Sequence, residues 1–321
     1  MLNFSIVFPG QGSQSVGMLN VLAQSYSIVQ ETFTSASQVV GFDCWELAQF
    51  GPQAVLDQTV NTQPVLLAAD IALWRIYCAE FPLSKPAFLA GHSLGEYAAL
   101  VAAESISFED AIHIVAQRGQ FMQLAAPQGQ GASLMAAILG LDNVLIEDIC
   151  KKVTQLNIKA QQIVAPANYN AIGQTVIAGH ACAVMQAIEL MKEAGAKRAI
   201  PLPVSVPSHC SLMQPAVEKL AAVLEKIEIR APQIPILHNK DVQLHAQPHK
   251  IRAVLCEQLV HPVRWVETIQ KFSENQVQNI IECGPGKVLS GLIKRIDNTL
   301  QVYNMDTPTS LSEILCLKTM R

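Results

Sequence analysis

A serine at the tip of a glycine-flanked turn is the clearest candidate nucleophile in this chain. Ser93 lies in the segment Gly91-His92-Ser93-Leu94-Gly95, directly after the apolar run 86–90. This G-x-S-x-G pattern is typical of a nucleophile elbow, in which glycines allow a sharp bend that exposes the hydroxyl. The backbone N–H of Leu94 opens the next helix and can stabilise the negative oxygen that forms when a carbonyl is attacked. The segment predicts acyl transfer or hydrolysis, with a chance glycine-rich turn as the alternative.

A serine hydroxyl becomes nucleophilic when a base takes its proton, and histidine suits that role near neutral pH. Eight histidines are candidates: His92, His113, His180, His209, His238, His245, His249 and His261. The turn should aim His92 away from the serine, and the polar stretch around His245 and His249 is expected to be solvated. His209 follows the serine in chain order, as the base does in α/β-hydrolases. The residues alone favour His209 and leave the choice open.

Two other segments are candidates for binding. The loop 9–14, Pro-Gly-Gln-Gly-Ser-Gln, lacks the spacing of a phosphate-binding loop. It either offers backbone N–H groups to an oxyanion or is a plain tight turn. Arg118 lies in an otherwise apolar helix, where the residues alone favour a buried ion pair with an acidic neighbour.

The composition excludes several classes of protein. The chain has 321 residues, of which 50% are hydrophobic and 15% charged, and a net charge of −4 with no long basic run, so we expect no nucleic-acid binding. The first residues do not form a signal peptide and no apolar run could span a bilayer, which predicts a cytoplasmic protein without membrane contact. The eight cysteines are dispersed, which argues against a disulfide framework and a zinc site. Cys210, beside His209, is expected to be a buried thiol.

The elements that must position these residues follow two patterns. Strands are predicted at 4–8, 86–90 and 278–282, and helices at 64–79, 96–104, 108–124 and 287–295. This alternation predicts an α/β body with a parallel sheet covered on both faces. The middle of the chain reads strand 134–139, helix 142–153, strands 162–165 and 175–178, helix 180–194 and strand 198–201. That order is the ferredoxin-like motif, so we predict an inserted subdomain over 128–200 and a body formed by 1–127 and 201–321.

Five motifs occur in one order along the chain. They are Phe8-Pro9-Gly10-Gln11-Gly12-Ser13-Gln14, Gly91-His92-Ser93-Leu94-Gly95-Glu96-Tyr97, Gln117-Arg118-Gly119, Val206-Pro207-Ser208-His209 and Gly284-Pro285-Gly286-Lys287-Val288-Leu289. Together they resemble the malonyl-CoA:acyl carrier protein transacylases of bacterial fatty-acid synthesis, over about residues 4–296. The resemblance implies a hydrolase-like α/β body with a ferredoxin-like insert, and neither a metal nor a redox cofactor.

The resemblance also implies a role for each residue that matches a family motif. Ser93 is then the nucleophile and His209 the base, and the backbone N–H groups of Gln11 and Leu94 form the oxyanion hole. Arg118 pairs with the free carboxylate of the malonyl group, for which a guanidinium fork is well suited.

The same resemblance assigns residues around this centre. The backbone carbonyl of Gln258 replaces the acid that hydrolases place behind the histidine, since no acidic residue stands out for that position. Asn168 and Asn170 line the family's cleft, or else are turn asparagines that bond their own backbone.

The implied partners are malonyl-CoA and an acidic carrier protein with a phosphopantetheine thiol. Basic residues suited to docking that carrier are Lys287, Lys294, Arg295, Lys197 and Arg198, although ordinary solvated surface also explains them. Two other functions are compatible with the scaffold: a serine hydrolase or thioesterase, and a docking module without catalysis. Arg118 argues against a hydrolase of neutral acyl groups, and the presence of both Ser93 and His209 argues against a docking module.

Overall fold

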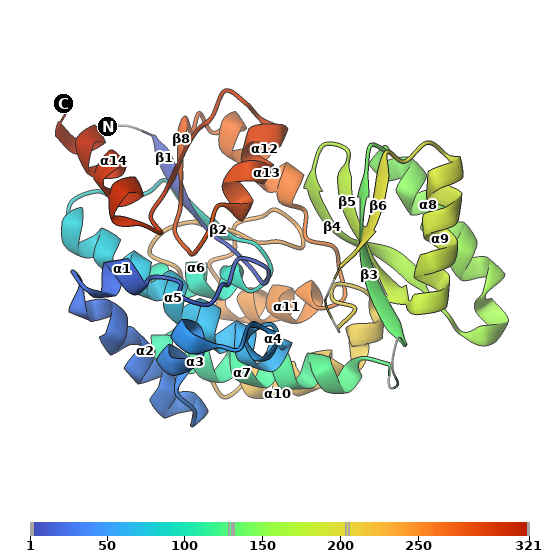
Figure 1. The fold of residues 1–321 in the computed structure, drawn as a ribbon, viewed down its shortest axis with the longest axis horizontal. Coiled ribbons are helices and arrows are strands. Elements are labelled where there is room, and N and C mark those ends of the chain that lie inside the picture. Colours follow the sequence, from blue (N-terminus) through green and yellow to red (C-terminus); the bar gives the residue numbers. More distant parts are fainter. Residues whose placement is uncertain (1–2, 128, 130–131, 203, 205, 320–321) are drawn as a thin grey trace.

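The computed structural model describes residues 3–127, 129, 132–202, 204 and 206–319. Two separate sheets form the framework (Figure 1). All strands of the larger sheet are parallel, in the spatial order β7-β2-β1-β8-β9. Their bounds are β1 (Phe4–Phe8), β2 (Phe88–Gly91), β7 (Ile236–Leu237), β8 (Asn279–Glu282) and β9 (Gln301–Asn304).

Helices cover both faces of this sheet because successive side chains of a strand point to opposite faces. Ile6 and Phe8 of β1 pack into the larger core, and Val7 between them packs into the core on the other face. The larger core involves α2 (Ser27–Val40), α5 (Thr59–Glu80), α6 (Gly95–Ala102), α7 (Phe108–Ala125), α10 (Gln214–Leu224) and α11 (Pro248–Gln258). The opposite core involves α12 (Trp265–Glu274) and α13 (Val288–Ile296).

The remaining helices of the body are short or terminal. They are α1 (Asn20–Ala23), α3 (Cys44–Phe50), α4 (Gln53–Leu56), the 3₁₀ turn η2 (Ser211–Met213) and α14 (Pro308–Thr319). No helix in the described part of the chain is sufficiently long and apolar to cross a membrane.

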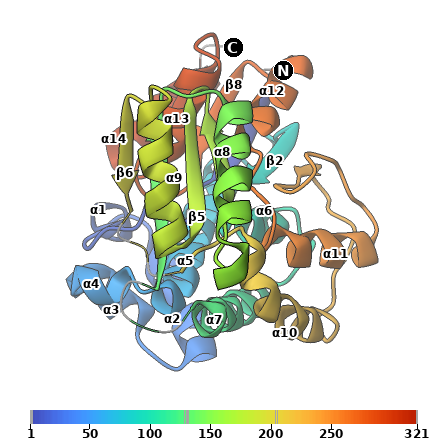
Figure 2. The same ribbon diagram turned by 90° about the vertical axis from the view of Figure 1, so that its right-hand side faces the viewer.

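The smaller sheet is antiparallel, in the order β4-β5-β3-β6. Its strands are β3 (Ser133–Leu139), β4 (Val164–Ala171), β5 (Gln174–His180) and β6 (Arg198–Pro201). In Figure 2, α8 (Asn143–Leu156) and α9 (Ala181–Glu193) lie over one face of it, with the short turn η1 (Ile158–Ala160) after α8. This arrangement is the predicted ferredoxin-like motif, so the predicted fold class is confirmed.

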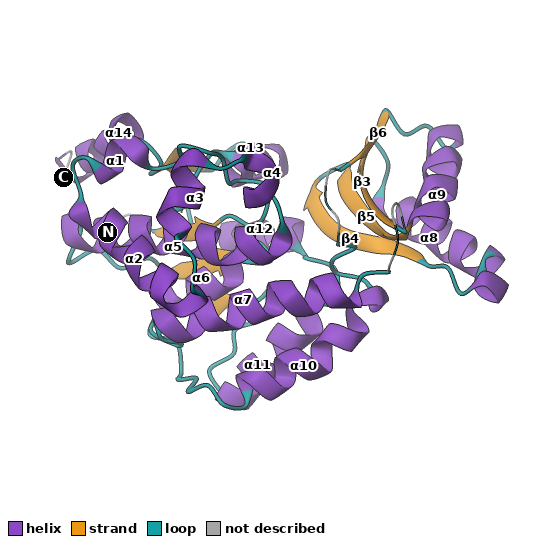
Figure 3. Cartoon of the chain, turned by 60° about the horizontal axis from the view of Figure 1, so that its bottom comes forward, coloured by secondary structure: helices purple, strands orange, loops and turns teal. Residues whose placement is uncertain are grey.

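The other face of the small sheet lies toward the body, as the orange strands in Figure 3 show. Met135 and Val176 on that face cluster with Cys210, the neighbour of His209. The backbone also joins the two parts: Tyr169 N–H donates to Val263 O at 2.9 Å, and Val263 N–H donates to Ala167 O at 2.9 Å. The small sheet therefore supports the loop that carries the candidate base.

Some elements differ from those predicted. β4 extends to Ala171 where the sequence indicated a strand ending at 165. Helices α1 to α4, α11, α12 and α14 and strands β7 and β9 were not predicted. The division of the chain into 1–127, 128–200 and 201–321 stays a prediction, and its boundary at 128 lies outside the described residues.

Candidate active site

The candidate nucleophile sits on the sharp turn between β2 and α6. Ser93 has φ +52°, a left-handed backbone conformation that residues with a Cβ rarely adopt. The flanking glycines make the turn possible: a Cβ at Gly91 would lie 1.9 Å from the carbonyl oxygen of Gly95. A Cβ at Gly95 would lie 2.1 Å from the carbonyl oxygen of Phe8. The elbow therefore packs backbone to backbone against β1.

His209 is in hydrogen-bond contact with this serine. Its Nε2 lies 2.8 Å from Ser93 Oγ, and its Nδ1 lies 2.8 Å from the backbone oxygen of Gln258. Because a carbonyl oxygen only accepts, Nδ1 carries the proton and Nε2 presents its lone pair to the serine hydroxyl. The dyad can thus move the serine proton onto Nε2.

Burial keeps this histidine neutral. The His209 side chain is almost wholly buried, and burial, together with the Arg118 cation, lowers the pKa of His209 to about 3. Both causes act in the same direction because each disfavours a second positive charge in the cleft. At neutral pH the imidazole is therefore an unprotonated base.

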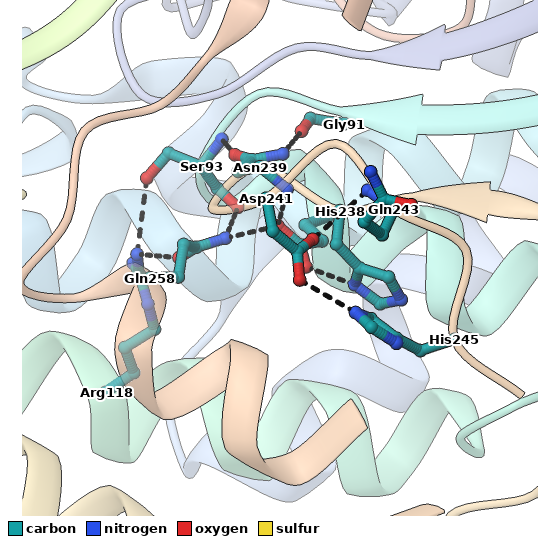
Figure 4. A network of polar contacts seen from close by, with 10 residues as sticks. Gly91, Ser93, Arg118, His238, Asn239, Asp241, Gln243, His245 and Gln258 are labelled. Carbon is teal, nitrogen blue, oxygen red and sulfur yellow. Dashed lines mark hydrogen bonds and ion pairs between the residues drawn. The ribbon is translucent and has the colours of Figure 1, made fainter. Parts of the chain in front are cut away.

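Arg118, on α7, points its guanidinium at the nucleophile. Its Nη2 donates to Ser93 Oγ at 3.2 Å and to Gln258 Oε1 at 2.9 Å (Figure 4). Its Nη1 donates to Gln63 Oε1 at 2.9 Å. The side chain is only 2% exposed. Among the described residues no carboxylate forms an ion pair with it, so the alternative of a buried pair with an acidic neighbour is wrong. Burial also lowers the pKa of Arg118, and the nearby negative charge of Glu96 offsets this desolvation only in part.

The loop after β1 lies against the elbow. His92 N–H donates to Phe8 O at 2.9 Å, and a Cβ at Gly10 would lie 2.4 Å from the carbonyl oxygen of His92. Gln11 follows Gly10, and Leu94 directly precedes α6, so two backbone N–H groups come from adjacent loops. N–H groups at the start of a helix have no partner within it, which leaves Leu94 N–H free of the α6 hydrogen-bond ladder.

Comparison with known proteins places this geometry in a family. The family model described as "Acyl transferase domain" matches residues 5–311. The malonyl CoA-acyl carrier protein transacylase of Haemophilus influenzae is 50% identical over 314 residues, which cover 98% of each chain. The chain belongs to the malonyl CoA-acyl carrier protein transacylase family.

Solved structures agree with this membership. The acyl carrier protein S-malonyltransferase of Vibrio cholerae superposes with a TM-score of 0.92 at 51% identity, covering 97% of this chain and 99% of its own. A malonyl-transacylase in complex with a type II polyketide acyl-carrier protein superposes with a TM-score of 0.94 at 49% identity, covering 98% of this chain and 99% of its own.

The two asparagines of this transacylase-family chain lie in β4, not in a turn. Asn170 Oδ1 lies 2.8 Å from His92 Nε2, so the asparagine bonds a side chain of the body and not its own backbone. Asn168 is 9% exposed and pairs with Val263 through an isolated bridge. The turn alternative is therefore wrong for both, and His92 points to Asn170 and away from the serine oxygen, as predicted.

Two further expectations concern residues beside the site. Cys210 is buried and its thiol donates to Pro207 O at 3.1 Å. Burial raises the pKa of Cys210 to about 11, as expected of an unreactive thiol. His249 is exposed, but the prediction for His245 is wrong: its ring is largely buried and its Nε2 lies 2.8 Å from Asp241 Oδ2. The acidic partner holds it against the body.

Sequence reasoning assigned no role in the site to Asn239, Glu96 or His238, which lie beneath the elbow. Asn239 accepts from Ser93 N–H at 2.7 Å and donates to Gly91 O at 2.6 Å. The buried carboxylate of Glu96 contacts Asn239, Gln258 and His238. Glu96 stood in a recognised motif and His238 among the candidate bases, but their partners are about 140 residues away, so local spacing carried no signal of the contact.

Proposed function

We propose that this protein transfers the malonyl group from malonyl-CoA to the phosphopantetheine thiol of acyl carrier protein, through a malonyl ester on Ser93. One observation carries the choice of substrate: a buried arginine without a carboxylate partner in the described chain lies 3.2 Å from the nucleophile oxygen. A thioesterase for neutral acyl groups would gain nothing from a buried cation at this point.

In the first half-reaction His209 Nε2 takes the proton of Ser93 as Oγ attacks the thioester carbonyl. The backbone N–H groups of Gln11 and Leu94 are the donors for the resulting oxyanion. This assignment is supported by the close approach of the two loops that carry them. As the tetrahedral intermediate collapses, the C–S bond breaks and the thiolate of CoA takes the proton from His209. Free CoA leaves, and the malonyl ester remains on Ser93.

The second half-reaction runs the same path in reverse with a different thiol. The phosphopantetheine thiol gives its proton to His209 Nε2 and attacks the ester carbonyl. Ser93 Oγ leaves, recovers the proton from His209, and the malonyl group is now a thioester of the carrier. The carbonyl of Gln258 holds one tautomer of His209 through both halves without adding a full charge.

Arg118 recognises the substrate by charge. Its fork forms two parallel charge-assisted hydrogen bonds with the malonyl carboxylate, which an acetyl group lacks. Asn168 and Asn170 line the cleft from the small sheet, and their place in β4 supports that role.

The carrier docks through basic side chains on the outer surface. Lys287, Lys294 and Arg295 are exposed on and beside α13, which contacts β4. Lys197 and Arg198 are also exposed, but they lie on and beside β6, at the opposite edge of the small sheet from β4. Because the two groups lie apart, one small acidic carrier cannot contact both, and we favour Lys287, Lys294 and Arg295 as its docking site. From these two substrates we infer that the protein acts in the cytoplasm.

Intact mass spectrometry with Ser93→Ala tests this function. The wild-type protein mixed with malonyl-CoA should gain one malonyl group, and should gain far less acetyl from acetyl-CoA. The Ser93→Ala protein should gain neither, because it lacks the hydroxyl at the elbow. A malonyl adduct on Ser93→Ala, or equal labelling by both donors, would contradict the proposal.

A further inference from the structure

Glu96 is a fully buried carboxylate that the mechanism above does not use. It lies in the first turn of α6, three residues after the nucleophile, and accepts three hydrogen bonds. Its Oε2 accepts from Gln258 Nε2 at 2.8 Å and from Asn239 N–H at 3.1 Å, and its Oε1 accepts from His238 Nδ1 at 2.6 Å. Burying a carboxylate is costly, and an apolar side chain would fill the space without that cost. A carboxylate at this position therefore calls for a role other than packing.

The first contact fixes the orientation of the Gln258 amide. Gln258 Nε2 donates to Glu96 and also to Ser93 O at 3.0 Å, while its Oε1 accepts from Arg118 Nη2 at 2.9 Å. A carboxylate can only accept, so it holds the NH₂ group on its own side and leaves the amide oxygen for the guanidinium. With the amide reversed, two sets of N–H donors would face each other at Arg118.

The same residue also orients the base. The backbone oxygen of Gln258 accepts from His209 Nδ1 at 2.8 Å. Gln258 therefore contacts the nucleophile, the base and the substrate-binding arginine, and Glu96 holds its side chain.

The second contact reaches the nucleophile from below. Glu96 accepts from the backbone N–H of Asn239. The side chain of Asn239 bridges Ser93 N–H and Gly91 O, as Figure 4 shows. These bonds hold both sides of a turn in which Ser93 has φ +52°. Such a conformation persists when its surroundings over-determine it.

His238 contacts the other oxygen of the Glu96 carboxylate. Its Nδ1 faces Glu96, whereas its buried Nε2 has no partner among the described residues, which fits a neutral ring that donates through Nδ1. The ring of His245, held by Asp241, lies against it with centroids 5.3 Å apart. The carboxylate is thus held on both oxygens.

We propose that Glu96 is a positioning residue that aligns Ser93, His209 and Arg118 through Gln258 and Asn239. The proposal rests on the function assigned above. It requires that a change at Glu96 alter the preference for malonyl as well as the rate, because the amide of Gln258 holds Arg118 directly.

Glu96→Gln tests this with little change in shape. The new amide accepts at one end only, so it cannot receive all three donors, and His238 can switch tautomer to preserve packing. We expect kcat/KM for malonyl-CoA to fall on the order of 10²-fold, as for misplaced reacting groups. The malonyl-over-acetyl ratio should fall as well. An unchanged ratio would overturn the proposal.

Glu282→Gln is the matched control. Glu282 is also fully buried and accepts from Leu289 N–H, Ser290 N–H and Asn304 Nδ2, but it contacts none of the reacting groups. Its substitution should lower the resistance to urea and leave the malonyl-over-acetyl ratio unchanged. An equal fall in the ratio for both variants would mean that Glu96 acts only through stability.

Two more variants, Gln258→Met and Glu96→Asp, test the same proposal independently. Gln258→Met preserves the backbone carbonyl behind His209, and its effect on the ratio should not add to that of Glu96→Gln if both act along one path. Full additivity would overturn the proposal. If Glu96→Gln does not fold, Glu96→Asp keeps the charge with a shorter reach, and a wild-type ratio in it would also overturn the proposal. If the wild-type protein itself is not malonylated, the proposed function fails instead.

Discussion

At the scale of single residues, the guanidinium of Arg118 lies 3.2 Å from the nucleophile oxygen, and its hydrogen-bond acceptors among the described residues are uncharged. In Arg118→Ala a bound malonyl carboxylate would have no partner, and an unpaired buried charge costs about 3–5 kcal/mol. The malonyl-over-acetyl ratio of kcat/KM should therefore fall by about two to four decades.

Arg118→Lys is the matched variant for this prediction. Lysine supplies the charge without the two-pronged fork, so it should restore only part of the ratio. Steady-state rates with both donors measure the effect. Equal losses for malonyl-CoA and acetyl-CoA in Arg118→Ala would show that the arginine is structural.

The pKa of His209, lowered to about 3, sets the pH dependence of the nucleophile. Only the neutral imidazole accepts a proton, so reactivity is lost as pH falls through this pKa and is retained above it. Ser93 should accordingly react with a neutral fluorophosphonate at a rate that stays high well below pH 6. Because the Arg118 cation lowers this pKa, Arg118→Ala should move the acid limb to higher pH. If the loss of reactivity occurs at the same pH in Arg118→Ala as in wild type, Arg118 does not lower the pKa of His209.

At the scale of elements, local patterns located the strands and helices whose sequence carries its own signal. The bounds of β1 and β6 agree with the predicted 4–8 and 198–201 because each is a short run between turn residues. β4 was predicted too short because Asn168 and Asn170 are typical of turns. Their strand conformation depends on Val263 and His92, which lie far away in sequence.

The residues of the site also divide into those that local sequence reveals and those that depend on distant contacts. Ser93 was identified from its own motif, because the elbow is a local structure. His209 and Arg118 needed the resemblance, since their meeting depends on the packing of α7 and of the loop before α10. Glu96 and Asn239 were missed because their role consists of contacts between segments more than 140 residues apart.

At the scale of the whole molecule, Asp70 couples folding to pH. It lies on α5 with both oxygens buried and without a hydrogen-bond partner in the described chain, next to the position of Gly284. Burial, and then the charge of Glu282, raise the pKa of Asp70 well above its ordinary value. The folded protein thus retains a proton that the unfolded chain releases above about pH 4, so stability falls as pH rises from there.

Asp70→Asn should remove this dependence, because the amide is neutral at every pH and similar in size. Relative to wild type, its free energy of unfolding in urea should increase between pH 5 and pH 8, by at most about 1.4 kcal/mol per pH unit. The exposed Asp148→Asn serves as the control and should show no such trend. A constant difference between Asp70→Asn and wild type at both pH values would contradict the prediction.

The strand order of the larger sheet has a consequence for synthesis on the ribosome. β1 is central in the finished sheet, between β2 and β8, yet β8 begins only at Asn279. A nascent chain that has reached residue 278 therefore still exposes one whole side of its first, fully buried strand. Such an unpaired edge invites pairing with other chains. Chains that stall or are cut short before β8 should therefore aggregate, and we expect the growing polypeptide to need chaperones until the β8 segment has emerged.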